Sequence, residues 1–133
     1  MESYRHAAIS AVASLAISYS LFQQPQTILV YAAFGTLAGT LIDLDHFVLA
    51  RLNTGNWKRL QNALRQPGTA FTDGKEVMQE TITSRQRYLS HLTLLFASTG
   101  SVFLIAGVKA AVLTFSVISL HICCDLYVSF KKL

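Results

Sequence analysis

Four apolar segments dominate the pattern of hydrophobic and polar positions along this chain. They cover about residues 7–22, 27–49, 92–108 and 110–130. A helix needs roughly 20 residues, within a range of about 17–25, to cross the hydrocarbon core of a bilayer. Each segment approaches that length once the polar residues at its end are included, so the pattern predicts four transmembrane helices.

The connections between these segments predict two helical hairpins. The turn at 23–26 is short and uncharged, and it contains Pro25, which interrupts helices. The turn at 107–109 is equally tight. Short connections make successive helices antiparallel neighbours. We therefore expect an all-α bundle of two hairpins, joined by the long segment 51–90.

The connecting segment 51–90 is polar and basic, and part of it has helical periodicity. Over residues 56–66, Trp57, Leu60 and Leu64 share one helical face, and basic residues occupy the rest of the turn. A basic amphipathic helix with a Trp commonly lies in the headgroup region of a membrane. A Pro-Gly pair at 67–68 ends this helix, and we expect a second helical stretch from about 75 toward 88.

Small residues in the first two segments predict close helix packing. Gly35 and Gly39 form a G-x-x-x-G motif, which lets membrane helices approach closely. Ser10, Ser14 and Ser18 give the first helix a small-residue stripe at the same spacing. Such motifs are common, so they favour a packed bundle only weakly.

Composition supports an integral membrane protein. The chain has 133 residues, enough for one domain over 1–133, of which 52% are hydrophobic and only 14% charged. Its mean hydropathy is +0.41. Soluble domains carry roughly 25% charged residues, so membrane lipids are the expected surroundings. The adjacent Cys123 and Cys124 match neither a disulfide framework nor the usual thiolate spacing of a zinc site.

The positions of the cations predict the orientation. The net charge is +4, and of the 11 Lys and Arg residues all but Lys109 lie in the N-terminal tail, in 51–90 or in the C-terminal tail. The positive-inside rule then places both termini and the 51–90 segment in the cytoplasm, as in a multi-pass inner-membrane protein. Because orientation accounts for the basic residues, nucleic acid is a disfavoured partner. Nothing in the sequence indicates an oligomeric state.

Histidines and aspartates lie near one end of each apolar segment. Ionisable groups inside membrane segments are costly, so each is a candidate for function. In an up-down-up-down topology all of these ends meet at the cytoplasmic face. The residues are His6, Asp43, Asp45, His46, His91, His121 and Asp125, which include all 4 histidines and three of the 7 acidic residues of the chain.

Residue type and spacing predict that these groups bind a metal ion. His121 and Asp125 are four residues apart, and Asp43 and His46 are three apart, so each pair shares a helical face. Asp45 points away unless the helix is locally broken. Imidazole and carboxylate ligands suit Zn, Fe or Mn, and we expect a divalent ion, with Zn first. Seven groups exceed the three protein ligands of a typical catalytic zinc site, which leaves open one ion with outer partners or a two-ion centre.

Each group taken alone also has a structural interpretation. His6 suits an interfacial polar residue, the Asp43–His46 run a helix end whose side chains reach water, and His91 a contact at the start of a helix. His121 with Asp125 suits a hydrogen bond inside the bundle. A single metal centre accounts for all of them together, and we prefer it for that reason.

At these residues the chain resembles the bacterial and archaeal membrane-bound metal-dependent hydrolases of the YdjM type. That family has an N-terminal His, a D-x-D-H on the second helix, an R-x-x-T-H-S-like element and a late H-x-x-x-D. The corresponding residues here are His6, 43–46, 87–91 with Ser90 in place of Thr, and 121–125. Ile42 stands where the family often has Pro, Gln86 and Tyr88 flank Arg87 in place of an H-R-G run, and Leu92 replaces a polar residue. These changes leave the expected ligands in place.

The site and the resemblance imply a membrane-bound, metal-dependent hydrolase that faces the cytoplasm. Asp45 and Arg87 are the candidate catalytic residues, because the planar guanidinium of Arg87 suits anionic oxygens. A lipid ester or phosphoester is the expected substrate, since the site would open at headgroup depth. The alternative is a non-enzymatic metal-binding or metal-transport protein, although transporter sites lie nearer the bilayer midplane. A haem protein with two His ligands would leave the aspartates unexplained.

Overall fold

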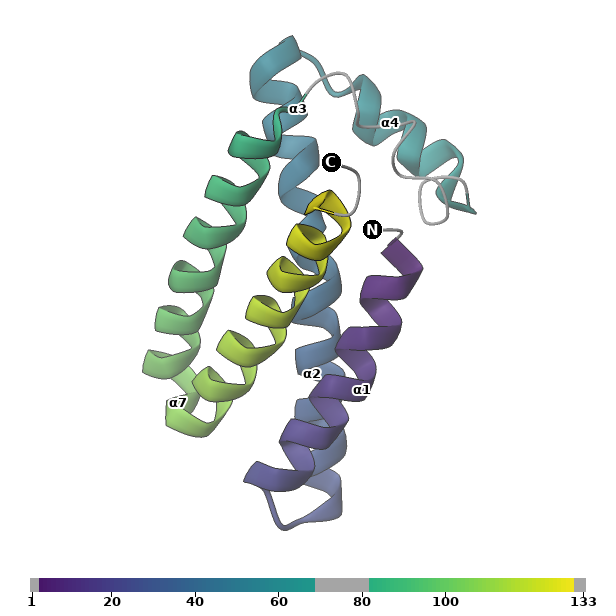
Figure 1. The fold of residues 1–133 in the computed structure, drawn as a ribbon. Helices are drawn as coiled ribbons and strands as arrows, with labels where there is room; N and C mark the ends of the chain where they lie inside the picture. Colours follow the sequence, from purple (N-terminus) through teal and green to yellow (C-terminus); the bar gives the residue numbers. More distant parts are fainter. Residues whose placement is uncertain (1–2, 69–81, 131–133) are drawn as a thin grey trace.

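The computed structural model describes residues 3–68 and 82–130, and all regular structure in these ranges is helical. The all-α prediction is therefore confirmed. In chain order the elements are α1 (Ser3–Leu21), α2 (Pro25–Leu41), the 3₁₀ turn η1 (Ile42–Leu44), α3 (Asp45–Thr54), α4 (Lys58–Arg65) and α7 (Ser84–Phe130). α2, η1 and α3 follow one another without a loop and form one long rod (Figure 1).

Two tight reversals create the two expected hairpins. The first is the turn between α1 and α2, after which Pro25 occupies the first turn of α2, a position that needs no backbone N–H donor. The second lies inside α7 at Gly107, whose φ of 82° and ψ of −177° are non-helical. Only glycine adopts that conformation at little cost. Figure 1 shows the two arms of α7, 84–106 and 108–130, running back along each other.

The third long helix begins earlier than the hydropathy pattern predicts. α7 starts at Ser84 rather than near Leu92, because a capping box precedes it. The side chain of Thr83 accepts a hydrogen bond from the backbone N–H of Gln86 (3.2 Å), and the Gln86 side chain accepts one from the Thr83 N–H (3.0 Å). His91 therefore lies two turns inside the helix. The second helical stretch expected from about 75 mostly falls outside the described residues.

Small residues bring α1 against α2, as the sequence predicted. A Cβ atom added at Gly35 would lie 2.6 Å from Oγ of Ser14, and one added at Gly39 would lie 2.6 Å from Cγ1 of Val117. Neither position has room for a methyl group. Gly39 is thus the place where α2 meets both α1 and the second arm of α7.

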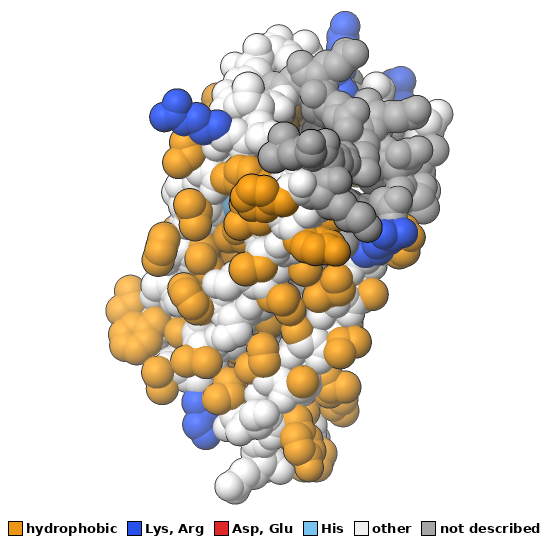
Figure 2. Space-filling model, in the orientation of Figure 1, with side chains coloured by type: hydrophobic (Ala, Val, Ile, Leu, Met, Phe, Trp, Pro, Cys, Tyr) orange, Lys and Arg blue, Asp and Glu red, His pale blue; other side chains and the backbone are white. Residues whose placement is uncertain are grey.

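Two helices are long and apolar enough to cross a membrane, judged by length and composition alone. They are Pro25–Thr54 and Ser84–Phe130, and the second reverses at Gly107. α1 does not meet the same criteria. Figure 2 shows hydrophobic side chains spread over the middle and lower part of one face of the molecule.

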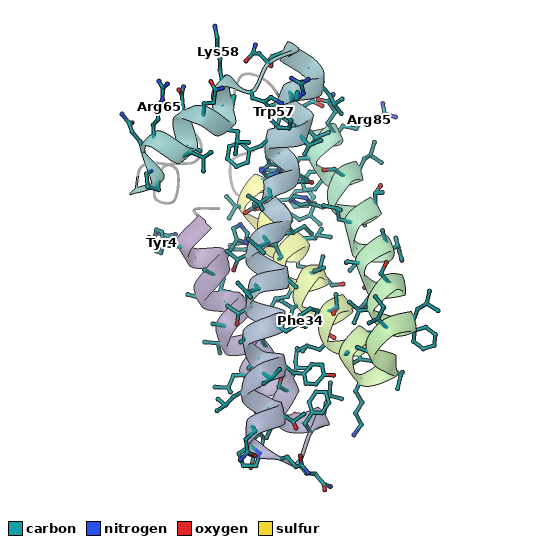
Figure 3. The ribbon with its side chains drawn as sticks, turned by 180° about the vertical axis from the view of Figure 1, so that it is seen from behind. Tyr4, Phe34, Trp57, Lys58, Arg65 and Arg85 are labelled. Carbon is teal, nitrogen blue, oxygen red and sulfur yellow. The ribbon has the colours of Figure 1, made fainter. Side chains whose placement is uncertain are left out.

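The basic helix α4 lies across the end of the bundle at which both termini are found (Figure 1). It confirms the helix expected over 56–66. Lys58 and Arg65 point away from the bundle (Figure 3). The guanidinium of Arg51, on α3, lies 4.9 Å from the centre of the Trp57 ring, a cation–π distance that fixes the start of α4 beside α3.

An apolar cluster supports the polar site from one side. Ile42, Leu95, Ile118 and Ile122 are buried against one another, and Leu126 packs on them. Ile42 precedes Asp43 and Ile122 follows His121 in sequence. The helices that carry the candidate ligands are therefore held together immediately next to those ligands.

Candidate metal centre

The structure brings the sequence-predicted residues together in the half of the bundle that carries α4, the start of α1 and the end of α7. Two overlapping groups have ligand atoms within 4.8 Å of one another. The inner group is Asp43, His91, His121 and Asp125, and the outer group is Asp45, His46 and His91. His6 belongs to neither group, but it contacts the inner one. A buried His/Asp cluster that could hold a metal ion is thus present.

The inner group has the spacing of ligands around one ion. Nε2 of His121 lies 3.3 Å from Oδ1 of Asp43, and Nε2 of His91 lies 3.6 Å from the same oxygen. Nε2 of His91 is also 3.9 Å from Oδ2 of Asp125. Two donor atoms bound to a tetrahedral ion at roughly 2.1 Å lie about 3.4 Å apart. The four residues come from η1 and from both arms of α7.

Hydrogen bonds fix the orientation of two imidazoles of this group. Nδ1 of His121 lies 2.8 Å from the carbonyl oxygen of Gly39, and because a carbonyl only accepts, Nδ1 carries the proton. Nδ1 of His91 lies 2.9 Å from Oδ2 of Asp45 and donates in the same way. Each ring then presents the lone pair of Nε2 to the centre. This is the usual arrangement of histidines that bind metals.

The Nε2 atoms of His91 and His121 face the inner group, are buried and have no hydrogen-bond partner among the described residues. The buried Nε2 atom of His46, in the outer group, has none either. A buried polar atom without a partner costs roughly 1–3 kcal/mol, so the two that meet in the inner group require an explanation. A metal ion bound by these two atoms would provide it, and the residues present therefore fit such an ion.

His6 acts on the centre through Asp125. Its Nε2 lies 3.0 Å from Oδ1 of Asp125, and both side chains are only 2% exposed. The other oxygen, Oδ2, faces His91. The His6 ring also stacks on the His121 ring, with centroids 4.0 Å apart. The sequence predicts His6 as a metal ligand; in the structure it lies outside both groups and contacts Asp125, a member of the inner group.

The outer group is a poorer metal site than the inner one, because one of its imidazole nitrogens is already hydrogen-bonded. His46 lies 3.8 Å from Asp43 through Nδ1 and 3.7 Å from Asp45 through Nε2. Its third member, His91, already uses Nδ1 toward Asp45. Only one nitrogen of His91 remains for a metal, and it faces the inner group. The inner group is therefore the better site for an ion.

The 3₁₀ turn η1 explains why both aspartates reach the cluster. Asp45 can turn inward only where the helix is locally broken, and the α-helical pattern is replaced by 3₁₀ over Ile42–Leu44. Short 3₁₀ stretches inside longer helices often mark functional positions. Asp43 faces the inner group and Asp45 faces His91 and His46.

Arg87 lies at the edge of the cluster and is 27% exposed. Its Nε is 3.8 Å from Oδ2 of Asp125. One terminal nitrogen donates to Oγ of Ser129 at 3.3 Å, and the Tyr88 hydroxyl also donates to that oxygen at 2.7 Å. The guanidinium is thus held near the centre and remains partly open to a ligand.

Three contributors to the site were not foreseen as such. The Ser90 hydroxyl donates a hydrogen bond to Oδ2 of Asp45, the Gly39 carbonyl orients His121, and Ser129 holds Arg87. Ser90 belongs to the 87–91 motif and Gly39 to the G-x-x-x-G motif, so the sequence pointed to both positions. No sequence motif includes Ser129, because only the tertiary fold brings it to Arg87.

The imidazoles pack directly on one another. The rings of His46 and His91 stack with centroids 5.1 Å apart, and those of His91 and His121 meet edge to face at 5.4 Å. A haem between two axial histidines would need to separate such rings. The arrangement favours a small ion.

Comparison with known proteins adds no relative: no family model, no curated protein and no solved structure matches this chain. The resemblance to the YdjM-type hydrolases therefore stays a prediction that rests on the short motifs alone.

Proposed function

We propose that this protein is a membrane-bound, metal-dependent hydrolase whose centre lies at the cytoplasmic face. One observation carries the proposal: buried Nε2 atoms without hydrogen-bond partners converge with carboxylate oxygens at the spacing of ligands around one ion. Asp43, His91, His121 and Asp125 hold a single divalent ion, with Zn preferred over Mn or Fe for this mixed set. His6, Asp45 and Ser90 orient those ligands, and His46 completes the outer edge.

The same helices span the membrane as four segments in this proposal. α1, the rod from Pro25 to Thr54, and the two arms of α7 form the segments, and α4 rests on the cytoplasmic surface. The hydrophobic side chains on the face seen in Figure 2 and the clustering of Lys and Arg near the termini support this arrangement. The centre then lies near one membrane surface, where lipid headgroups and water are both present.

The hydrolysis of an ester or phosphoester suits the residues around the centre. A bound divalent ion would lower the pKa of water and polarise the scissile group. Oδ1 of Asp45 has no hydrogen-bond partner among the described residues and accepts a proton from the attacking water. The C–O or P–O bond breaks, and the leaving alcohol takes that proton. Arg87 binds the anionic oxygens of the substrate through its exposed side.

Metal analysis combined with an activity panel tests this proposal. The purified protein in detergent is expected to contain about one metal ion per chain and to cleave some member of a panel of lipid esters and phosphoesters, with activity abolished by a chelator and restored by Zn, Mn or Fe. With the metal saturating, Asp45→Asn and Arg87→Ala should lower the rate. If these variants keep their metal but cleave the substrate more slowly, Asp45 and Arg87 act in catalysis rather than in assembly of the site.

The alternative, a non-enzymatic metal-binding or transport protein, is distinguished by the same experiment. A tightly bound ion with no cleavage across the panel would favour it. The position of the cluster favours hydrolysis, because transport sites lie near the bilayer midplane, whereas these residues lie in the half of the bundle that carries α4 and the start of α1.

A further inference from the structure

An apolar groove leads away from the cluster along the outside of the bundle. It has a volume of about 570 Å³ and lies between the rod 41–49 and the first arm of α7. Its lining is Leu41, Leu44, Asp45, Val48, Leu49, Ser90, Thr93 and Leu94. Asp45 and Ser90 also belong to the surroundings of the proposed metal ion. The groove therefore connects the lipid-facing surface with the site.

The groove is open along its side. Its walls are well exposed, since Leu41 is 50%, Leu44 51% and Val48 51% exposed. Above them, the side-chain amides of Asn53 and Gln86 make two reciprocal hydrogen bonds of 3.2 and 3.1 Å, which join the end of α3 to the start of α7. The open side of the groove faces the hydrocarbon layer of a membrane in the proposed arrangement.

The groove places its two polar groups between apolar walls. Leu41 and Leu94 lie about one turn further toward the bilayer centre than Asp45 and Ser90, whereas Val48 and Leu49 lie about one turn toward α4. An acyl chain over Leu41 and Leu94 would leave its ester or phosphoester bond beside Asp45 and Ser90. The guanidinium of Arg87, near the site, favours an anionic headgroup.

We infer that this groove binds an acyl chain of a membrane lipid and thereby presents the ester or phosphoester bond of that lipid to the metal centre. The inference rests on the proposed function for the claim that the bound lipid is the substrate. The substrate class is an anionic lipid that enters sideways from the cytoplasmic leaflet. Separate parts of the protein bind the two ends of the lipid. Arg87 and the cluster bind the headgroup, and the Leu and Val side chains of the groove contact the acyl chain.

Binding of the chain is tested without reference to catalysis. The full chain is placed in lipid nanodiscs that contain a phosphatidic acid probe with a photoactivatable diazirine in its acyl chain, and the cross-linked residues are mapped by mass spectrometry. We expect labelling at 41–49 and 90–94 that excess unlabelled phosphatidic acid removes. Labelling at 104–105, where Leu104 is 83% exposed, should resist that competition, because ordinary surrounding lipid contacts it.

A pair of matched variants sharpens the test. Val48→Trp fills the groove, whereas Leu104→Trp makes a comparable change on the lipid-facing surface outside it. We expect Val48→Trp to lower the competable labelling at least tenfold with metal content unchanged, and Leu104→Trp to leave both unchanged. Labelling in proportion to exposure at both places, with no competition, would overturn the inference. So would an interface between two copies of the chain that buries the groove, detected as cross-links between protomers at 41–49.

Activity then separates this inference from the proposed function. If a short-chain, water-soluble ester or phosphoester is cleaved equally by wild type and Val48→Trp while the long-chain lipid loses at least tenfold in kcat/KM, both proposals hold. If Val48→Trp lowers kcat/KM for neither substrate, the hydrolase proposal stands and the groove proposal is refuted. Competable labelling without any cleavage keeps the lipid site and refutes the hydrolase.

Discussion

Nε2 of His121 lies 3.3 Å from Oδ1 of Asp43, and this pair joins the second hairpin to the first at the centre of the cluster. His121 is 0% exposed in its side chain, so the contact takes place away from water. Its other nitrogen is already committed to the Gly39 carbonyl. Nε2 is therefore the only nitrogen of His121 that can bind a metal, and it faces the site of the proposed ion.

Removal of either member of this pair should abolish metal binding. We expect His121→Ala and Asp43→Asn to weaken metal affinity by more than the roughly 10–100-fold that loss of an outer partner causes. Metal content after purification and competition against a chromophoric chelator measure the effect. Cys123→Ser, a change at an exposed position outside both groups, is the control. Full retention of metal by both variants would refute the proposed metal site.

Asp45 and Ser90 should tune the centre without being essential to its existence. Asp45 holds the proton of His91 on Nδ1, and Ser90 in turn holds Asp45. Ser90→Ala and Asp45→Asn should lower metal affinity by about 10–100-fold, less than the loss in His121→Ala. Ser90→Thr keeps the hydroxyl and should rescue most of the affinity. A Ser90→Thr variant as weak as Ser90→Ala would contradict this role.

His6 should behave as a partner of Asp125 rather than as a ligand. Its Nε2 hydrogen bond at 3.0 Å holds one carboxylate oxygen in place. His6→Gln can still donate from its amide, whereas His6→Ala leaves Asp125 without this donor. We expect His6→Gln to bind metal more tightly than His6→Ala, with both above His121→Ala in affinity. If His6→Ala removes the metal as completely as His121→Ala does, His6 is a ligand.

Hydropathy and helix spacing were sufficient for much of this structure. The four apolar segments, the proline turn and the reversal at Gly107 gave the helices and hairpins, and the up-down path brought the His and Asp residues to one half of the bundle. Helical spacing also placed Asp43 near His46 and put His121 with Asp125 in one group. These predictions work because each depends on local periodicity or on the direction of the chain.

Side-chain contacts between helices could not be predicted from hydropathy and helical spacing. The partner of His121 is Asp43 at 3.3 Å, and that of Asp125 is His6. Which imidazole faces an ion and which faces a carboxylate depends on the rotation of each helix about its axis, which one sequence does not define. The early start of α7 was missed for a different reason: its first two turns are polar, and the capping box rather than hydropathy sets its boundary.

Gly39 should be intolerant of a side chain. A Cβ atom there would lie 2.6 Å from Cγ1 of Val117 and would also press on Ser10, so α2 would have to move away from its neighbours and carry the Gly39 carbonyl off His121. We expect Gly39→Ala to lower the free energy of unfolding by about 1–3 kcal/mol and to weaken metal binding. Thermal unfolding in detergent and metal content are the measurements.

Gly100 provides the matched control for that substitution. It lies inside the first arm of α7, and an added Cβ atom would meet nothing within 4 Å. Gly100→Ala should therefore leave metal binding unchanged and stabilise the protein by up to about 1 kcal/mol, through helix propensity alone. Equal destabilisation by both substitutions would mean that close packing at Gly39 is not responsible.

The proposed orientation can be tested with single cysteines at the two ends of the bundle. In a Cys123→Ser, Cys124→Ser background, Asn56→Cys precedes α4 and Gln23→Cys lies in the turn between α1 and α2, and both positions are exposed. The positive-inside rule places the α4 end in the cytoplasm. A membrane-impermeant maleimide should therefore label Gln23→Cys in right-side-out vesicles and Asn56→Cys only in inside-out vesicles. Labelling of both positions from the same side would show that the chain does not cross the membrane between them, and the reverse pattern would place the metal centre on the outer face.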